Sequence, residues 1–226
     1  MTRTTRTKPA AVRRLATRLT IGIAALATAV GVSVVTPATA SAQYSATSSS
    51  DVASDANHAL WLLVHWEDTG DLADYTAYVR ARLDTAESTA SQLGLTAAEL
   101  DAEWGAIDVP KQHVLMAAMS QIGVPYRSRM SKAGRGFDCS GLVLFAYSQA
   151  GIGLPRSSRD QIRAAAEIDR STLEPGDLVY YPGHISMYLG DDFVIHSPQP
   201  GQDVEVREIF DRSLRFGEAI DVTPQP

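Results

Sequence analysis

The spacing of apolar residues changes once along this chain, and that change restricts the fold class more than any other feature. From Asp51 to about Gly105 apolar residues recur at helical spacing, whereas four short runs after "EPGD" have strand character. These runs are 177–181, 184–189, 192–196 and 203–208. The last of them, "DVEVRE", alternates in the manner of a half-buried strand. Helices followed by short, closely spaced strands predict an α+β fold, with helices packed on an antiparallel sheet.

Three helices are predicted before residue 106. The segment 57–66 is apolar nearly all round, which is typical of a helix covered on more than one side. A second helix is predicted from Asp71 to a stop at Gly94, because apolar residues recur there every seven positions. Its predicted buried stripe comprises Leu72, Val79, Leu83, Ala86, Ala90 and Leu93. The pair Thr96 and Glu99 predicts a capping box for a third, short helix. The three tryptophans, Trp61, Trp66 and Trp104, are expected to lie in the core.

Three more helices are predicted in the second half. One begins near Pro110 and runs to Gly123, and another runs from Asp138 to Ala150. A capping box at Ser158 and Gln161 predicts a short third one. Between the first two lies an irregular loop, 123–137, with four cationic residues and no acidic one before its end.

The first 42 residues read as an export signal. A basic start is followed by a 15-residue apolar run and by Ala40-Ser41-Ala42, which predicts cleavage before Gln43. The apolar run would span about 22 Å as a helix, short of the ~30 Å hydrocarbon core, so no stable membrane anchor is expected after cleavage. The predicted mature chain keeps 14 Lys and Arg against 26 Asp and Glu, a formal charge of −12. Such an acidic protein is not expected to bind nucleic acid.

Cys139 is the only cysteine of the 226 residues, so the chain must fold without an internal disulfide. Asp138 is a good N-cap, which places Cys139 in the first turn of a helix, where backbone N–H groups and the helix dipole favour a thiolate. Asp138 opposes this effect by its own charge, so a basic partner is needed. Ser140 and Gly141 are small and leave the thiol approachable.

A histidine pair is the predicted partner. If 184–188 and 192–196 form a hairpin with a three-residue loop, His184 and His196 face each other directly, with Cβ atoms about 5 Å apart. One imidazole can then pair with Cys139 while the other orients it, which is the arrangement of cysteine acyl-transfer chemistry. Two alternatives remain open at this point. Cys139 can be a buried structural residue, or the three side chains can be zinc ligands.

Several ordered segments resemble the NlpC-type peptidoglycan endopeptidases, bacterial relatives of papain. They are "FDCSGLV", "LPRSSRDQ", "LEPGDLVYY" and "GHISMYLGDDFVIHSP", and the resemblance covers about 109–215. It implies a papain-like catalytic domain in which Cys139 is the nucleophile, His184 the base and His196 the orienting residue. It also implies that Tyr126, in G-x-P-Y, lines the site. Asp138, Ser140, Arg156 and Ser157 complete the predicted substrate-binding residues.

One departure from the family affects the cleft. Where the family often has Trp-Gly-Gly after the tyrosine, this chain has Arg127-Ser128-Arg129-Met130. We hypothesise that this cationic loop binds carboxylates of the substrate; the alternative is a solvated loop. The residues after Tyr126 therefore leave substrate preference open.

Four regions are predicted: a signal peptide (1–42), a flexible linker (43–50), a helical N-terminal extension (51–108) and an NlpC-type catalytic domain (109–226). The predicted function is that of a secreted or wall-associated cysteine endopeptidase without a cofactor, which cleaves peptidoglycan stem peptides after D-glutamate. An amidase or acyltransferase with the same residues and a non-catalytic wall-binding protein are the alternatives. The extension is expected to pack on the catalytic domain or restrain it, and is a candidate surface for another wall hydrolase or wall-associated protein.

Overall fold

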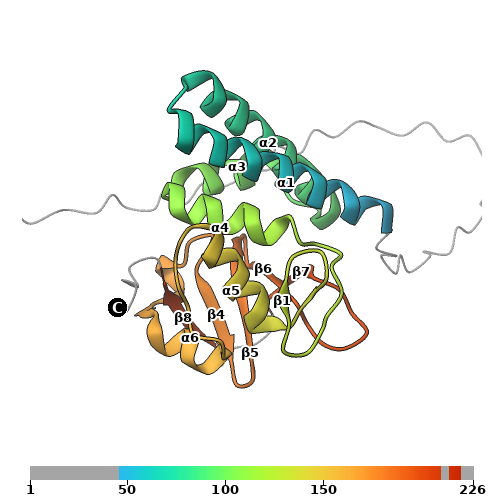
Figure 1. The fold of residues 1–226 in the computed structure, drawn as a ribbon, viewed down its shortest axis with the longest axis vertical. Coiled ribbons are helices and arrows are strands. Elements are labelled where there is room, and N and C mark those ends of the chain that lie inside the picture. Colours follow the sequence, from blue (N-terminus) through green and yellow to red (C-terminus); the bar gives the residue numbers. More distant parts are fainter. Residues whose placement is uncertain (1–45, 210–213, 220–226) are drawn as a thin grey trace, which may run out of the picture. The chain divides into compact units, whose positions relative to one another are not determined.

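The computed structural model describes residues 46–209 and 214–219, and the predicted signal peptide lies outside them. Three helices form the N-terminal part: α1 (Ala46–Thr69), α2 (Leu72–Leu93) and α3 (Ala97–Ala106), with α1 and α2 packed as a hairpin (Figure 1). Because α1 begins at Ala46, it includes much of the segment that the sequence predicted as a flexible linker. Within the described part of the chain, no helix is long and apolar enough to cross a bilayer.

The predicted ends of α2 are confirmed. The side chain of Asp71 accepts a hydrogen bond from the backbone N–H of Ala73, and Gly94 ends the helix with a φ of 71°. These are the N-cap and left-handed C-cap that the local sequence indicates.

The predicted buried faces of these helices are partly wrong. Ala86 and Ala90 are buried as predicted, but Leu72 is 77% exposed, and Tyr78, Ala81, Arg82, Thr85 and Thr89 complete the buried face of α2. Trp61 on α1 is 58% exposed, whereas Trp104 is fully buried. Thr96 precedes α3 as predicted but makes no side-chain capping bond. The buried residues of α2 also recur every seven positions, as Tyr78 with Thr85 and Arg82 with Thr89 do, so the predicted spacing was correct but the predicted face was displaced around the helix.

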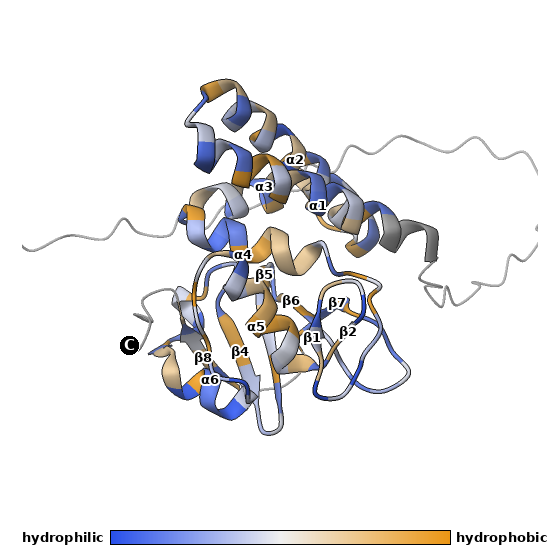
Figure 2. Cartoon of the chain, in the orientation of Figure 1, coloured by the Kyte–Doolittle hydropathy of each residue, from blue (hydrophilic) through white to orange (hydrophobic). Residues whose placement is uncertain are grey.

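Helix α4 (Val109–Met119) lies between the hairpin and the rest of the fold, in contact with α1 and with α5 (Cys139–Gln149). Every residue from 111 to 119 is buried. A helix that is apolar nearly all round is expected only where neighbours cover all its faces. The hydropathy colours of Figure 2 place hydrophobic residues along α4, α5 and β4.

Six strands form one antiparallel sheet in the order β3-β8-β4-β5-β6-β7. The strands are β3 (Ala166–Ile168), β4 (Leu178–Tyr181), β5 (His184–Gly190), β6 (Phe193–His196), β7 (Glu205–Glu208) and β8 (Arg215–Glu218). A two-stranded ribbon, β1 (Ser131–Lys132) with β2 (Gly136–Phe137), precedes α5. Two more elements lie between α5 and β4: the helix α6 (Ser158–Ala164) and a short 3-10 turn, η1 (Arg170–Thr172). The four predicted strands match β4 to β7, and the α+β class with a helical N-terminal region is confirmed.

The register of the β5–β6 hairpin differs from the prediction. Met187 pairs with Ile195 and Gly190 with Phe193, so the loop has two residues, Asp191 and Asp192, instead of three. Both take left-handed φ values of 47° and 61°, as a tight hairpin turn requires. The register shifts by two residues, so side chains keep their predicted faces, but His196 is diagonal to His184 instead of opposite it.

The helical region is anchored to the sheet through Trp104. Its indole N–H donates to the carbonyl of Leu189 at 2.7 Å, at the far end of β5 from His184. The hydroxyl of Tyr78 on α2 donates to Gln112 on α4 at 2.7 Å. Buried apolar residues of α1–α3 and of the sheet belong to one continuous cluster. The boundary at 108 remains a prediction, but a chain cut there would expose part of this shared core.

Candidate active site

Cys139 is the first residue of α5 and is half-buried. Asp138 caps the helix by accepting a hydrogen bond from the N–H of Gly141 at 2.7 Å, as predicted. The structure shows a further reason why residue 141 is a glycine: a Cβ at this position would collide with the carbonyl oxygen of Met130. That carbonyl accepts the N–H of Asp138 at 3.0 Å, so the cationic loop is held against the start of α5.

The start of β5 lies against the thiol. Burial raises the pKa of Cys139, while hydrogen bonding from the backbone N–H groups of Ile185 and Ser140 favours the thiolate, and the charge of Asp138 opposes it. The net direction is upward, so Cys139 is a neutral thiol at neutral pH. His184 precedes Ile185 in the chain, so its backbone lies next to the N–H that contacts the thiol.

The two predicted histidines are in contact. Nε2 of His184 lies 2.8 Å from Nδ1 of His196, with the rings nearly perpendicular at 86°. Diagonal neighbours on adjacent strands are within reach of rings of this size, which is why the altered register preserves the pair. Because Nε2 of His184 is engaged, only its Nδ1 is left to act on the thiol.

Both imidazoles are held neutral. Burial, assisted by the positive charge of Arg207, lowers the pKa of His184 to about 4. Burial, together with His184 and Arg207, lowers the pKa of His196 to about 3. With both groups neutral, a general base is favoured over a preformed ion pair.

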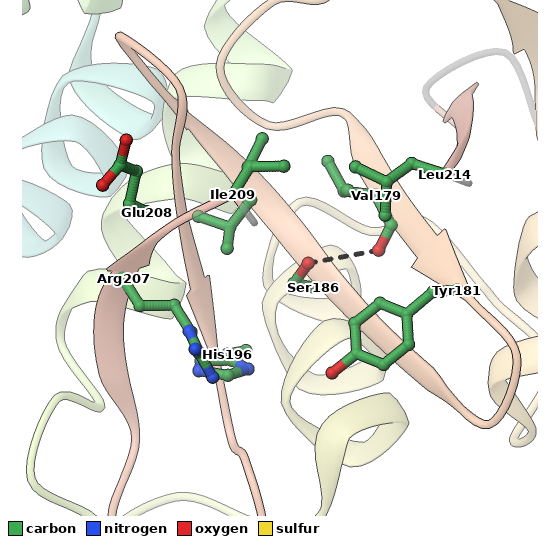
Figure 3. Close-up of a pocket in the computed structure, with 9 residues that line it drawn as sticks. Val179, Tyr181, Ser186, His196, Arg207, Glu208, Ile209 and Leu214 are labelled. Atoms are coloured by element: carbon green, nitrogen blue, oxygen red, sulfur yellow. Dashed lines mark hydrogen bonds between the residues drawn. The ribbon is translucent and has the colours of Figure 1, made fainter. Parts of the chain in front are cut away.

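Arg207 and His196 line a pocket of about 210 Å³ together with Val179, Tyr181, Ser186, Val194, Glu208, Ile209 and Leu214. Figure 3 shows the side chain of Arg207 extending toward His196 from the neighbouring strand, and the hydroxyl of Ser186 donating to the carbonyl of Val179. The cation that depresses the pKa of both histidines therefore comes from β7.

A second, open cleft of about 440 Å³ contains the thiol. Its lining residues are Tyr126, Arg129, Asp138, Cys139, Ser140, Arg156, Ser157, Ser158 and Gly183. All five residues predicted to bind substrate are therefore in one cleft with Cys139. No residue of α1–α3 is among them, so in this structure the helices do not cover the thiol.

Arg156 is tied to the helix cap. Its guanidinium donates to both carboxylate oxygens of Asp138, at 2.8 and 3.0 Å, and to the hydroxyl of Ser140 at 2.9 Å. The bidentate pair offsets the negative charge of Asp138 beside the sulfur. Arg156 therefore supports the cleft and contributes little free positive charge to it.

The sequence assigned the cap of α6 to the wrong serine. Ser157 is the N-cap, because its hydroxyl accepts the N–H of Asp160 at 3.2 Å, and Ser158 is the first helical residue. Gln161, predicted to close a capping box, is instead fully buried, and its amide donates to the carbonyls of Ser140 and Pro155 at 2.9 Å. It joins α6 to the turn after the nucleophile, a role that no local sequence signal indicates.

The cationic loop separates into two kinds of residue. Arg129 lines the cleft and takes a left-handed φ of 59°, with its N–H donating to Asp138 at 2.7 Å. Arg127 packs its aliphatic carbons over Gly136 and is not among the lining residues. Only part of the predicted carboxylate-binding loop therefore faces the thiol.

Glu205 is a neighbour of the site that the sequence reasoning missed. It pairs with His196 across β6 and β7, and its Oε1 lies 3.5 Å from Nε2 of His196. The alternation of "DVEVRE" could have placed it on the histidine face, had the register been known. In 46–209 and 214–219, no three His, Cys, Asp or Glu side chains are grouped to hold a metal ion.

Comparisons with known proteins identify the family of the region that contains these residues. A model of the NlpC/P60 family matches residues 123–215. Probable endopeptidases of Mycobacterium bovis and Mycobacterium tuberculosis are 43% identical over 96 residues, which cover 41% of this chain and 25% of theirs. Murein DD-endopeptidase MepH of Escherichia coli is 40% identical over 101 residues, covering 40% of this chain and 37% of MepH. The chain thus matches only a minor part of these relatives' length.

One solved structure is that of the P60 domain from a Mycobacterium avium subspecies paratuberculosis antigen. It is 30% identical and covers 50% of this chain and 96% of that chain, with a TM-score of 0.45. The family match spans Cys139, both histidines and the lining residues from Tyr126 to Gly183. The chain therefore carries a domain of the NlpC/P60 family.

Proposed function

We propose that this chain is a secreted cysteine endopeptidase that hydrolyses an amide bond in the stem peptides of peptidoglycan. The observation that carries the proposal is that Cys139, at a helix start, contacts the backbone N–H of Ile185, the residue that follows His184, whose ring is hydrogen-bonded to His196. The relatives support the substrate class, since they include MepH and the peptidoglycan endopeptidase RipA of Mycolicibacterium smegmatis, 36% identical over 114 residues.

Acylation begins with a proton transfer. Nδ1 of His184 takes the thiol proton as the sulfur of Cys139 attacks the peptide carbonyl, and the imidazolium remains hydrogen-bonded to His196 through Nε2. The oxyanion that forms lies at the first turn of α5, where the backbone N–H of Cys139 is a suitable donor. The C–N bond then breaks, and the leaving amine takes the proton from His184.

Deacylation uses the same base. His184, neutral again, takes a proton from water as the water oxygen attacks the thioester carbonyl. The C–S bond breaks, the peptide leaves as a carboxylic acid, and the proton returns to the sulfur. Each histidine ends in its starting state, so one residue acts as base and acid in turn.

The scissile bond is proposed to follow D-glutamate. A supporting relative is the gamma-D-glutamyl-L-lysine dipeptidyl-peptidase of Bacillus cereus, 37% identical over 93 residues. The cleft supplies the cationic Arg129, the paired Arg156 and Asp138, and the hydroxyl of Tyr126, which suit a peptide bearing both charged and polar groups. Binding of another wall protein through α1–α3 stays a separate prediction.

The test is digestion of purified peptidoglycan with mass analysis of the released fragments. Fragments cut after D-glutamate are expected from the wild type and none from Cys139→Ala, while Ser148→Ala on the exposed end of the same helix serves as the matched control. Iodoacetamide should abolish the activity. Fragments cut at another amide would correct the bond assignment, and an inactive wild type that still binds the wall would favour the binding-protein alternative.

A further inference from the structure

The buried ring of His196 has one nitrogen without a partner. His196 is 2% exposed, and its Nδ1 faces His184, but its Nε2 makes no hydrogen bond with any described residue. An unsatisfied buried nitrogen is costly, so a nearby acceptor or donor is expected to complete it. An acceptor at Nε2 holds the proton of His196 on Nε2, whereas a donor at Nε2 leaves that proton on Nδ1.

Glu205 is placed to complete this nitrogen. Its Cα pairs with that of His196 in the β6–β7 register, and its Oε1 is 3.5 Å from Nε2. A movement of about 0.5 Å would bring the two atoms into hydrogen-bond range. The side chain of Glu205 is 38% exposed, which leaves it room to make that movement. Burial raises the pKa of Glu205, and the positive charge of Arg207, two residues along the same strand, opposes that rise.

We propose that Glu205 is a positioning residue that selects the productive tautomer of both histidines. A carboxylate at Nε2 of His196 can only accept, so the proton of His196 is held at Nε2. Its Nδ1 is then an acceptor and must receive the Nε2 proton of His184. The remaining nitrogen of His184, Nδ1, carries a lone pair and can take the thiol proton from Cys139.

Without this acceptor the opposite arrangement is equally available. His196 can protonate Nδ1 and donate to Nε2 of His184, which places the proton of His184 on Nδ1. That tautomer presents a proton to the thiol and cannot act as its base. Glu205 thus acts on Cys139 through two rings, without touching the substrate, and the inference rests on the proposed hydrolase function.

Three variants separate this role from a structural one. Glu205→Leu removes the acceptor at similar size, Glu205→Gln keeps an amide oxygen that can accept, and Glu167→Leu alters an exposed glutamate on β3, at the other edge of the sheet. We expect Glu205→Leu to lower kcat by roughly 10- to 100-fold with little change in KM, as second-sphere changes do. Glu205→Gln should recover most of kcat, and Glu167→Leu should match the wild type.

The second measurement does not depend on turnover. In the full chain carrying Cys139→Ala, ¹⁵N NMR of the imidazole nitrogens should show His196 protonated at Nε2 and His184 protonated at Nε2. Adding Glu205→Leu should move part of the population to Nδ1. The proposal is overturned if His196 is protonated at Nδ1 with Glu205 intact, or if Glu205→Leu retains wild-type kcat. Because the tautomers are read in an inactive protein, failure of the hydrolase assignment would leave this result interpretable.

Discussion

Removing the charge of Lys111 should destabilise the fold far more than removing any exposed cation. Lys111 on α4 has a side chain only 4% exposed, and its Nζ contacts Glu174 at 2.9 Å, Asp177 at 3.0 Å and Glu218 at 2.8 Å. Burial alone would lower the pKa of Lys111, but hydrogen bonds to the three carboxylates outweigh it and raise the pKa. Lys111 therefore stays charged and joins α4 to the segment before β4 and to β8.

The magnitude follows from the burial of the three acids. The side chains of Glu174 and Glu218 are 58% and 40% exposed, so water can solvate them when Lys111 is replaced by methionine. Asp177 is 1% exposed and would be left as a buried charge without its cation. Breaking a buried pair from one side costs about 3–5 kcal/mol, which corresponds to a Tm lower by roughly 6–20 °C for a chain of this size.

Urea unfolding of Lys111→Met, followed by circular dichroism, measures the change in the free energy of unfolding. Arg170→Met is the matched control, because it breaks an exposed pair with Asp192 and should cost at most about 1 kcal/mol. The double change Lys111→Met with Asp177→Asn should recover part of the loss, since the stranded charge is gone. A loss below about 1 kcal/mol in Lys111→Met would refute the reasoning.

Three predictions concern the candidate active site. Arg129→Ala should raise KM for stem peptides roughly 10-fold, because Arg129 lines the cleft. Arg127→Ala should leave KM unchanged, because the side chain of Arg127 packs over Gly136. Equal KM values for the two variants would dismiss carboxylate binding by the loop. Because the pKa of His184 is lowered to about 4, kcat/KM should fall only as the pH approaches that value. Arg207→Met removes a positive charge that repels protonated His184, so it should move the acidic limb of the pH profile to higher pH. An unchanged acidic limb would contradict the effect of Arg207 on this pKa. Gly141→Ala should impair both folding and activity, because the added Cβ would collide with the carbonyl oxygen of Met130. Gly153→Ala should change neither, because nothing lies near that position. Melting curves and turnover rates of the two variants measure the difference.

The sequence predicted best what short-range chemistry controls. Asp71 and Gly94 bound α2 as expected because a cap and a left-handed glycine act on the adjacent turn alone. Asp138 and Cys139 were placed correctly at the start of α5 for the same reason. The faces of β5 and β6 were also correct, since side chains alternate strictly along a strand.

Features that depend on an unusual turn conformation or on residues far along the chain were mispredicted or missed. The β5–β6 turn depends on two consecutive aspartates with positive φ, which residue type alone does not demand, so the loop length was wrong by one residue. β8 returns after β7 to pair with β4 and β3, and its four residues carry no alternating pattern that indicates this. Gln161 and Glu205 matter through partners far along the chain, and no local spacing identifies such residues.

The placement of the indoles has a practical consequence. All three tryptophans of the chain lie in α1 or α3, and none lines the cleft around Cys139. Fluorescence excited selectively at tryptophan therefore reports on the helices, and through Trp104 on their attachment to the carbonyl of Leu189. Substrate turnover reports on the opposite end of the same strand. Following both signals during gradual unfolding would reveal whether the two ends of β5 come apart together or one after the other.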